Sequence, residues 1–255
     1  MPKLLEGRRA LVLGVANKWS LAYAIAQAFV REGAEIILTY QGERLKAAAE
    51  ELGNDLTPGT RVLNCDVTKD DDIARLADDL SGGKLDAVVH SIAYANREDL
   101  SRPYLETSRS GYLLAQEVSS YSLVGVSRMM APLMTGGGAI LTLSYLGSVR
   151  VVPNYNVMGV AKAALEASVR YLASDLGPSN IRVNAISAGP VKTASARGIK
   201  DFTKMLEGVA ERTPLRRNTD PAEVADTAVF LASDLGRGVT GNVIYVDAGF
   251  QIMAM

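Results

Sequence analysis

The sequence has 255 residues, 48% of them hydrophobic, which is enough to bury one large core. Its 27 basic residues are balanced by 28 acidic ones, and the net charge of −1 gives no electrostatic footprint for nucleic-acid binding. Cys65 is the single cysteine, which excludes a disulfide framework within the chain and a multi-cysteine metal site and fits a reducing cytoplasm. No stretch approaches 18 apolar residues, so we expect no transmembrane helix and no contact with a membrane.

Short apolar runs alternate with segments of helical periodicity along the whole chain. Strands are predicted over residues 10–13, 35–40, 61–65, 85–90, 139–143, 181–186 and 243–246. Helices are predicted over residues 20–32, 71–80, 108–134 and 221–233. A further helix is predicted to follow the second strand and to run to residue 52, and another to carry Tyr155 and Lys162. This alternation predicts one α/β domain over residues 1–255, a doubly wound Rossmann-type fold with a seven-stranded parallel sheet.

Polar residues or glycines follow six of these strands. They are Gly14, Gln41, Asp66, Ser91, Tyr145 and Gly189. Ligands of open parallel sheets bind beyond the carboxyl ends of the strands, so these positions form a candidate site. Ordinary turn chemistry selects the same residue types, and this alternative stays open.

The first strand-to-helix turn reads GVANKWSLAYAIA, in which only Gly14 remains of the usual G-x-G-x-x-G dinucleotide fingerprint. Ser20 is a good helix N-cap. Its hydroxyl, with the backbone N–H groups of Leu21 and Ala22, is suited to phosphate oxygens. A purely structural cap is an equally good interpretation of Ser20.

The second and third strands end at the positions where adenosine binds in such folds. Gln41 is neutral and suits a ribose hydroxyl, whereas Arg44 and Lys46 leave NADP possible and Glu43 opposes a phosphate. Asp66 is placed to accept a hydrogen bond from an adenine amino group. A turn-capping role for Asp66 is the alternative.

Two tyrosines and a lysine gather between residues 144 and 162. Tyr155 and Lys162 are seven residues apart, nearly two helical turns, so both side chains leave one face of a helix. A nearby ammonium lowers the pKa of a phenol, which suits a tyrosine that relays protons. Tyr145 is expected on the preceding loop, facing the same site. An amphipathic surface helix is the alternative interpretation.

Several segments together resemble a known family. They are Gly14, Ser20-Leu21-Ala22, Asp66-Val67, Ser91-Ile92-Ala93-Tyr94-Ala95, Tyr145, Tyr155-x₆-Lys162 and Ala188-Gly189-Pro190-Val191-Lys192-Thr193. From about Leu5 onward the chain resembles the NADH-dependent enoyl-acyl-carrier-protein reductases, a divergent branch of the short-chain dehydrogenase/reductases in bacterial type II fatty acid synthesis. Ordinary members of the larger family have Tyr-x₃-Lys after a catalytic serine, and Tyr145 lies close to where that serine would be.

This resemblance implies hydride transfer from NADH, with NADPH less expected, to C3 of a trans-2-enoyl thioester and protonation at C2. It implies that Tyr155 bonds the thioester oxygen, that Lys162 holds the nicotinamide ribose, and that Tyr145 shapes the enoyl pocket. It leaves open which tyrosine delivers the proton. The implied cofactor contacts are Gly14, Ser20, Leu21, Gln41, Asp66, Val67, Ser91, Ile92, Ala93, Lys162, Val191, Thr193, Ala194 and Ser195, and the implied substrate contacts are Ala95, Tyr145 and Tyr155. Ala93 and Ala194-Ser195 depart from the commoner residues of the family.

Residues 192–217 are expected to form a substrate-covering helical lid. The segment has seven basic and three acidic residues, and apolar residues recur in it at helical spacing. A core helix would show the same stripe. Our hypothesis is that Lys200 and Lys204 steer an acidic acyl carrier protein toward the pocket.

The resemblance further implies a cytoplasmic homotetramer that pairs the helices near residues 108–134 and 156–175. His90, at the end of an apolar run, is expected to be structural, and no metal is implied. Two other functions stay open: a carbonyl reductase on the same fold, which the x₆ spacing disfavours, and a dinucleotide sensor, for which Tyr145, Tyr155 and Lys162 would be superfluous.

Overall fold

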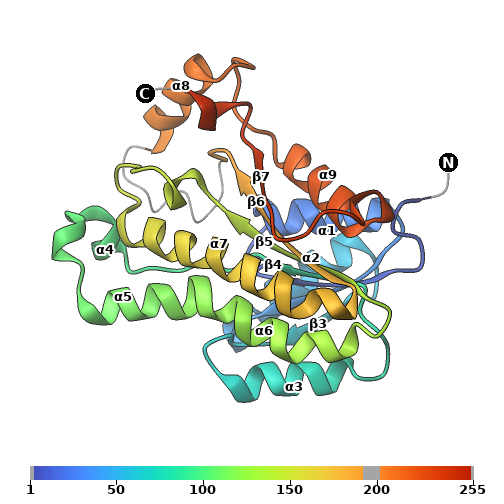
Figure 1. The fold of residues 1–255 in the computed structure, drawn as a ribbon. Coiled ribbons are helices and arrows are strands. Elements are labelled where there is room, and N and C mark those ends of the chain that lie inside the picture. Colours follow the sequence, from blue (N-terminus) through green and yellow to red (C-terminus); the bar gives the residue numbers. More distant parts are fainter. Residues whose placement is uncertain (1–2, 192–201, 254–255) are drawn as a thin grey trace.

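The computed structural model describes residues 3–191 and 202–253. Its centre is a sheet of seven parallel strands in the order β3-β2-β1-β4-β5-β6-β7 (Figure 1). The strands are β1 (Arg9–Leu13), β2 (Glu35–Tyr40), β3 (Arg61–Asn64), β4 (Ala87–His90), β5 (Gly138–Ser144), β6 (Ile181–Ala188) and β7 (Val243–Val246). The predicted doubly wound fold and its seven parallel strands are confirmed.

Helices cover both faces of this sheet. They are α1 (Leu21–Arg31), α2 (Lys46–Leu56), α3 (Asp70–Leu80), α4 (Arg97–Ser101), α5 (Arg109–Gln116), α6 (Ser122–Met130), α7 (Asn156–Leu176), α8 (Phe202–Arg212) and α9 (Pro221–Ala232). The helices α1 and α9 pack together on one face, whereas α3, α6 and α7 lie on the other (Figure 1). Both faces of the strands are therefore buried, which explains why their sequences do not alternate in polarity.

The helix predicted over residues 108–134 differs from expectation. It is interrupted by a π-helical turn, η3 (Glu117–Tyr121), and α6 ends at Met130, before a short 3₁₀ turn that contains Pro132. Proline limits continuation of a helix. The second helix also runs four residues past the predicted end, to Leu56, and α4 was not predicted at all.

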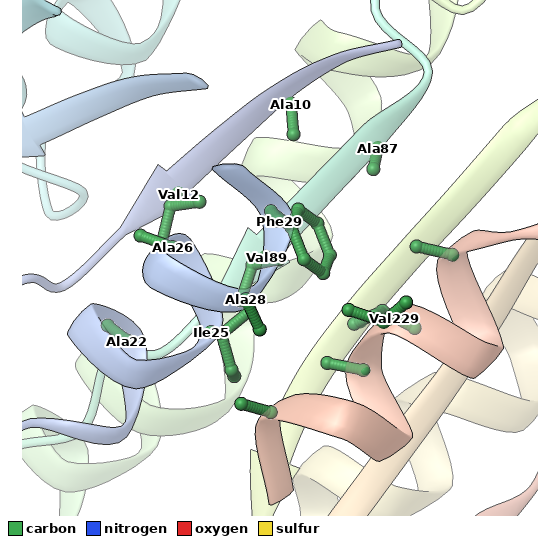
Figure 2. Close-up of a cluster of buried hydrophobic side chains, with 14 of the residues drawn as sticks. Ala10, Val12, Ala22, Ile25, Ala26, Ala28, Phe29, Ala87, Val89 and Val229 are labelled. Atoms are coloured by element: carbon green, nitrogen blue, oxygen red, sulfur yellow. The ribbon is translucent and has the colours of Figure 1, made fainter. Parts of the chain in front are cut away.

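Two large apolar clusters, one on each face of the sheet, form most of the core. Ala10 and Val12 of β1 belong to one cluster and Leu11 and Leu13 to the other, as the two-residue period of a strand requires. In Figure 2, the side chains of β1 and β4 meet Phe29 and the small residues of α1, with Val229 of α9 beside them. Full burial of a side chain such as that of Phe29 contributes about 1.5–3 kcal/mol to stability. This packing fixes the ends of β1 and β4 relative to α1.

Among residues 3–191 and 202–253, no helix is long and apolar enough to cross a bilayer.

Candidate active site

Because all seven strands are parallel, their carboxyl ends lie along one edge of the sheet. The strand order reverses between β1 and β4, which is where ligands bind in such sheets. Gly14 follows β1 at this point with φ of 91°, a conformation that disfavours a side chain. A Cβ on Gly14 would also lie only 2.1 Å from the backbone oxygen of Ser91, after β4. Glycine is thus required at position 14 because the backbone after β1 passes so close to the backbone after β4.

Ser20 is the N-cap of α1, as predicted. Its Oγ accepts a hydrogen bond from the N–H of Tyr23 at 3.2 Å and donates one to the carbonyl oxygen of Asn17 at 2.8 Å. The first-turn N–H groups of Leu21 and Ala22 donate to no described residue. These two donors and the positive end of the helix dipole are suited to an anion.

Gln41 and Asp66 lie together beyond β2 and β3. The Asp66 carboxylate accepts hydrogen bonds from the N–H and the hydroxyl of Thr68, at 3.1 and 2.8 Å. Burial opposes ionisation of Asp66, but the hydrogen bonds from Thr68 and Gln41 hold its pKa below the usual value. Asp66 is therefore a charged turn cap, and the predicted role toward an adenine stays a prediction.

The two predicted tyrosines meet beyond β5. The ring centroids of Tyr145 and Tyr155 are 4.9 Å apart and the ring planes make an angle of 68°, an edge-to-face contact. Gly147, between them in the chain, lies so close to the Tyr155 ring that a Cβ would approach its Cδ1 to 2.4 Å. The absent side chain thus lets the turn η5 (Leu146–Ser148) rest on Tyr155.

The seven-residue spacing suggested that Tyr155 lies inside the helix with Lys162. In the structure Tyr155 instead precedes α7, as its N-cap residue. Both of its neighbours, Asn154 and Asn156, have positive φ, of 63° and 38°. Asparagine tolerates this region better than most residues, and such strain concentrates at functional sites. The side-chain amide of Asn156 donates to the carbonyl oxygens of Leu100 and Arg102, at 2.8 and 2.7 Å, and so fixes the start of α7.

Lys162 is buried, with 6% of its surface exposed. Its Nζ donates a hydrogen bond of 2.7 Å to the carbonyl oxygen of Leu143 in β5. Burial lowers the pKa of Lys162 to about 8, although the nearby Glu166 carboxylate opposes this shift. The ammonium therefore titrates close to neutral pH and points to the end of β5 that carries Tyr145.

The expectation that Lys162 lowers the pKa of Tyr155 is wrong. Burial raises the pKa of Tyr155 strongly, and the Tyr145 and Glu166 side chains add to this rise. Burial also raises the pKa of Tyr145 to about 12. Both phenols are hence protonated at neutral pH, and each is a hydrogen-bond donor. The Tyr145 hydroxyl is buried and has no partner among the described residues.

Glu166 is a residue of this site that the sequence prediction missed. Its Oε1 accepts hydrogen bonds from the hydroxyls of Ser144, at 2.5 Å, and Ser148, at 2.6 Å. These serines flank Tyr145 in the chain, so Glu166 anchors the segment that carries this tyrosine. A carboxylate four residues after Lys162, on the same helical face, was the available signal.

Asn156 was missed as well. The signal was the Asn-Tyr-Asn sequence, because asparagine is the non-glycine residue most enriched at positive φ. The remaining predicted substrate contact, Ala95, packs together with Tyr155 against an apolar cluster at the start of α7. The structure thus brings Tyr145 and Tyr155 into contact, bonds Lys162 to the end of β5 that precedes Tyr145, and packs Ala95 against the same apolar cluster as Tyr155.

The described part of the predicted lid is α8 and the segment after it. Leu206 and Val209 of α8 are buried, and Val209 packs with Leu146 and Phe250, beside Tyr145. Val191, a predicted cofactor contact, is buried directly after β6. The predicted cofactor residues Thr193, Ala194 and Ser195, and Lys200, lie outside the described residues, as does the side chain of Lys204.

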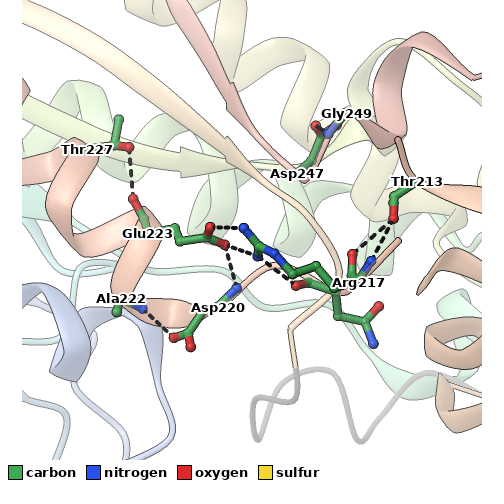
Figure 3. A network of polar contacts seen from close by, with 9 residues as sticks. Thr213, Arg217, Asp220, Ala222, Glu223, Thr227, Asp247 and Gly249 are labelled. Carbon is green, nitrogen blue, oxygen red and sulfur yellow. Dashed lines mark hydrogen bonds and ion pairs between the residues drawn. The ribbon is translucent and has the colours of Figure 1, made fainter. Parts of the chain in front are cut away.

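A polar network fixes the segment between α8 and α9 (Figure 3). The Arg217 guanidinium donates to both carboxylate oxygens of Glu223, at 2.8 and 2.5 Å, and lowers the pKa of Glu223 to about 2. Asp220 and Glu223 form a capping box at the start of α9. Arg217, one of the seven basic residues of the predicted lid, is therefore paired with Glu223 within the fold. The net positive charge that the lid offers to a carrier protein is smaller by this residue.

His90 is structural, as predicted. It is fully buried, its ring nitrogens lie 3.1 Å from the Thr142 Oγ1 and 2.8 Å from the Ser122 Oγ, and burial lowers its pKa to about 3. Among the residues that the structure describes, no group of His, Cys, Asp and Glu side chains is arranged to hold a metal ion.

The site fits a dinucleotide. The open N–H groups of Leu21 and Ala22 suit the pyrophosphate, and the ammonium of Lys162 has three donors, of which one is bonded to a described acceptor, Leu143. The buried hydroxyl of Tyr145 is a further donor that has no partner among the described residues. A polar ligand at this edge of the sheet would satisfy these groups.

Comparisons with known proteins point to one family. A family model described as Enoyl-(Acyl carrier protein) reductase matches residues 14–251. The NADH enoyl-acyl-carrier-protein reductase FabI of Bacillus subtilis is 53% identical over 253 residues, 98% of each chain. The NADPH enoyl-acyl-carrier-protein reductase FabI of Staphylococcus aureus is 48% identical and covers 97% of this chain and 98% of its own. The crystal structure of the Bacillus cereus enoyl-acyl carrier protein reductase with NADP+ and indole naphthyridinone has a TM-score of 0.97 at 52% identity, and covers 99% of this chain and 100% of its own.

Proposed function

The chain belongs to the enoyl-(acyl carrier protein) reductase family, and we propose that the tyrosines beyond β5 and the lysine of α7 carry its chemistry. The enzyme reduces the trans-2 double bond of enoyl-acyl-carrier-protein in fatty acid synthesis, with NADH as the expected cofactor and NADPH less so. The observation that carries the assignment of residues is the contact of Tyr145 with Tyr155 beyond β5, with Lys162 bonded to Leu143 near the end of the same strand.

Bound NADH supplies the hydride that reduces C3 of the enoyl thioester. As negative charge then develops on the thioester oxygen, the protonated phenol of Tyr155 donates a hydrogen bond to it. The raised pKa of Tyr155 supports a donor role over a phenolate base. Tyr145, in contact with Tyr155, shapes the pocket for the enoyl group and is a second candidate for protonation at C2.

The cofactor-binding role is proposed for residues along the carboxyl edge of the sheet. The ammonium of Lys162 holds the nicotinamide ribose, and the N-terminus of α1 with Ser20 and Leu21 holds the pyrophosphate. The remaining proposed contacts are Gly14, Gln41, Asp66, Val67, Ser91, Ile92, Ala93, Val191, Thr193, Ala194 and Ser195. The proposed substrate contacts are Ala95, Tyr145 and Tyr155.

The proposed lid, residues 192–217, closes over the acyl chain and excludes water from the reaction. The burial of Leu206 and Val209, and the packing of Val209 against Leu146, which follows Tyr145 in the chain, support this role. Lys200 and Lys204 steer the acidic carrier protein toward the pocket. Reversal of both charges is expected to raise KM for the carrier-bound substrate and to spare a coenzyme A thioester. Equal changes in KM for both substrates would refute steering.

We also propose a cytoplasmic homotetramer that pairs the helices near residues 108–134 and 156–175. Exposed apolar side chains on α5 and α7, among them Leu113 and Tyr171, support an interface there. Sedimentation of the purified protein measures the assembly directly, and a monomer at micromolar concentration would contradict it.

Three assay conditions, two with a substrate and one without, distinguish this function from the alternatives. Oxidation of NADH, followed by its absorbance, is expected with an enoyl thioester and not with a 3-ketoacyl thioester or without substrate. Consumption with the ketoacyl thioester alone would instead indicate a carbonyl reductase. NADH binding without consumption in all three cases would indicate a dinucleotide sensor.

A further inference from the structure

A single π-helical turn, η3 (Glu117–Tyr121), interrupts the long helix beside the site. Such turns are rare, and inside α-helices they occur frequently at functional sites. The turn packs against α7, which carries Lys162, and it is hydrogen-bonded to the segment that follows β4. It therefore lies between two of the segments that form the site.

Ser119 in this turn is fully buried and bonds both backbone groups of Tyr94. Its Oγ accepts a hydrogen bond from the Tyr94 N–H at 2.9 Å and donates one to the Tyr94 carbonyl oxygen at 3.0 Å. One hydroxyl thus satisfies the whole polar backbone of one residue, which fixes that residue in position and orientation.

Tyr94 lies between Ala93, assigned above to the cofactor, and Ala95, assigned to the substrate. Residues 91–96 have no regular secondary structure. Between the end of β4 and Asn96, the hydrogen bonds to described residues are those of Ser91 to Leu13 and of Tyr94 to Ser119. Ser119 is hence the anchor of the segment at the point where cofactor and substrate would meet.

A second buried contact ties the π-helical region to β4. The Ser122 hydroxyl donates to the carbonyl oxygen of Val118 at 2.7 Å, which leaves its oxygen to accept from the His90 ring at 2.8 Å. His90 in turn contacts Thr142 of β5 at 3.1 Å. The segment 91–94 is therefore held to the π-helical region at both of its ends, by His90 through Ser122 and by Tyr94 through Ser119.

We propose that Ser119 is a positioning residue for enoyl reduction, which holds the backbone of Tyr94 so that residues 91–95 keep nicotinamide and acyl thioester at reacting distance. The proposal rests on the assignment of these residues to cofactor and substrate. A displacement of about 1 Å at reacting atoms costs on the order of 100-fold in rate. A relaxed segment would consequently lower kcat more than it lowers the affinity for NADH.

The chain offers a matched control in Ser127 of α6. Ser127 is also fully buried, but its Oγ has no hydrogen-bond partner among the described residues. The substitutions S119A and S127A remove the same atom from two adjoining helical segments, η3 and α6, and only S119A releases Tyr94. A third variant, S119C, retains a weak donor and acceptor and is expected to give intermediate values.

The experiment measures kcat, KM for an enoyl thioester, the Kd of NADH, and the isotope effect on kcat with NADH deuterated at the transferred position. For S119A we expect kcat to fall roughly tenfold, as for a lost hydrogen bond to a buried group. The Kd of NADH should change by less than about threefold, and the isotope effect should rise because hydride transfer becomes more rate-limiting. S127A should match the wild type.

Amide hydrogen exchange at Tyr94 shows whether S119A releases the segment. Faster exchange at Tyr94 with kcat within about twofold of the wild type would overturn the proposal, as would an equal loss of kcat in S127A. A fall in activity that only follows the folded fraction, with an unchanged isotope effect, would show a merely structural role and overturn it too. If the wild-type enzyme itself failed to reduce the enoyl thioester, the proposed function would fail, and that outcome is separate.

Discussion

The proposed site has two halves, one at the start of α1 and one between β5 and α7, and their polar side chains differ in whether they have hydrogen-bond partners. At the start of α1, the Ser20 hydroxyl both accepts from Tyr23 and donates to Asn17, so it is satisfied by its own chain. Beyond β5, the Tyr145 hydroxyl is buried without a partner among the described residues, and Lys162 is a buried cation. Buried polar groups of this kind cost stability unless a partner pairs with them.

This difference separates groups that are satisfied within the fold from the side chains that we propose for the chemistry. The α1 half consists of backbone N–H groups and a helix dipole, which any capped helix provides. The β5–α7 half contains side chains whose pKa values are shifted by burial and which a purely structural role would not need. Substitutions should therefore affect catalysis strongly in the second half and mildly in the first.

The largest effect is expected for Tyr155→Phe. Loss of a single donor to a developing oxyanion costs about 10²–10³-fold in kcat, and the ring that packs on Gly147 is retained. The Kd of NADH should change by less than about threefold. Tyr145→Phe removes the same atom from the neighbouring ring and so tests the second candidate for protonation at C2. Steady-state kinetics with an enoyl thioester measure both, and unaltered turnover in Tyr155→Phe would remove this residue from the chemistry.

A smaller effect, mainly on binding, is expected for Lys162→Ala. Hydrogen bonds from a charged group contribute about 1.5–3 kcal/mol, so NADH should bind about 10- to 100-fold more weakly. Lys162→Met separates the charge from the volume of the side chain, because it fills most of the same space. Fluorescence titration with NADH measures the affinity. Tight binding by both variants would place the ribose away from Lys162.

The sequence predicted the fold, and it indicated candidate residues for half of the proposed site, for a physical reason. Buried parallel strands need continuous apolar runs, and those runs located all seven strands. The Tyr-x₆-Lys spacing located Tyr155 and Lys162 because side-chain chemistry requires particular residue types. The proposed pyrophosphate site instead depends on backbone N–H groups, which leave little trace in the sequence beyond Gly14.

The errors also have physical causes. The pKa of Tyr155 was predicted in the wrong direction because spacing does not show burial, which raises this pKa, and because the Nζ of Lys162 is bonded to Leu143. The turn η3 was missed because an inserted residue hardly changes apolar periodicity over a long helix. Glu166 was missed because its partners, Ser144 and Ser148, become neighbours only in the folded chain.

Glu166→Gln tests the electrostatics of the β5–α7 half through pH. The Glu166 carboxylate raises the pKa of Lys162 against the effect of burial, and the resulting pKa is about 8. Removal of the negative charge should lower this pKa, so that Lys162 loses its proton at a lower pH. The alkaline decline of kcat/KM should then move toward neutral pH, while glutamine still accepts from Ser144 and Ser148.

The control for this shift is Asp175→Asn, which removes an exposed carboxylate from the same helix. Profiles of kcat/KM from about pH 6 to 9.5 measure the change. An alkaline limb that stays in place in Glu166→Gln, or that moves equally in both variants, would show that the protonation of Lys162 does not control the reaction.

The smallest effects are expected at Ser20, where capping and phosphate binding can be separated. Ser20→Ala removes the N-cap, so the free energy of unfolding should fall by about 1 kcal/mol and NADH should bind only a few-fold more weakly. Ser20→Asp keeps a good cap, which should preserve stability, but places a negative charge where we propose the pyrophosphate. Denaturant unfolding and NADH titration of both variants decide between the two roles. If Ser20→Asp bound NADH as tightly as the wild type does, Ser20 would be a structural cap alone, and the pyrophosphate would have to lie elsewhere along the edge of the sheet.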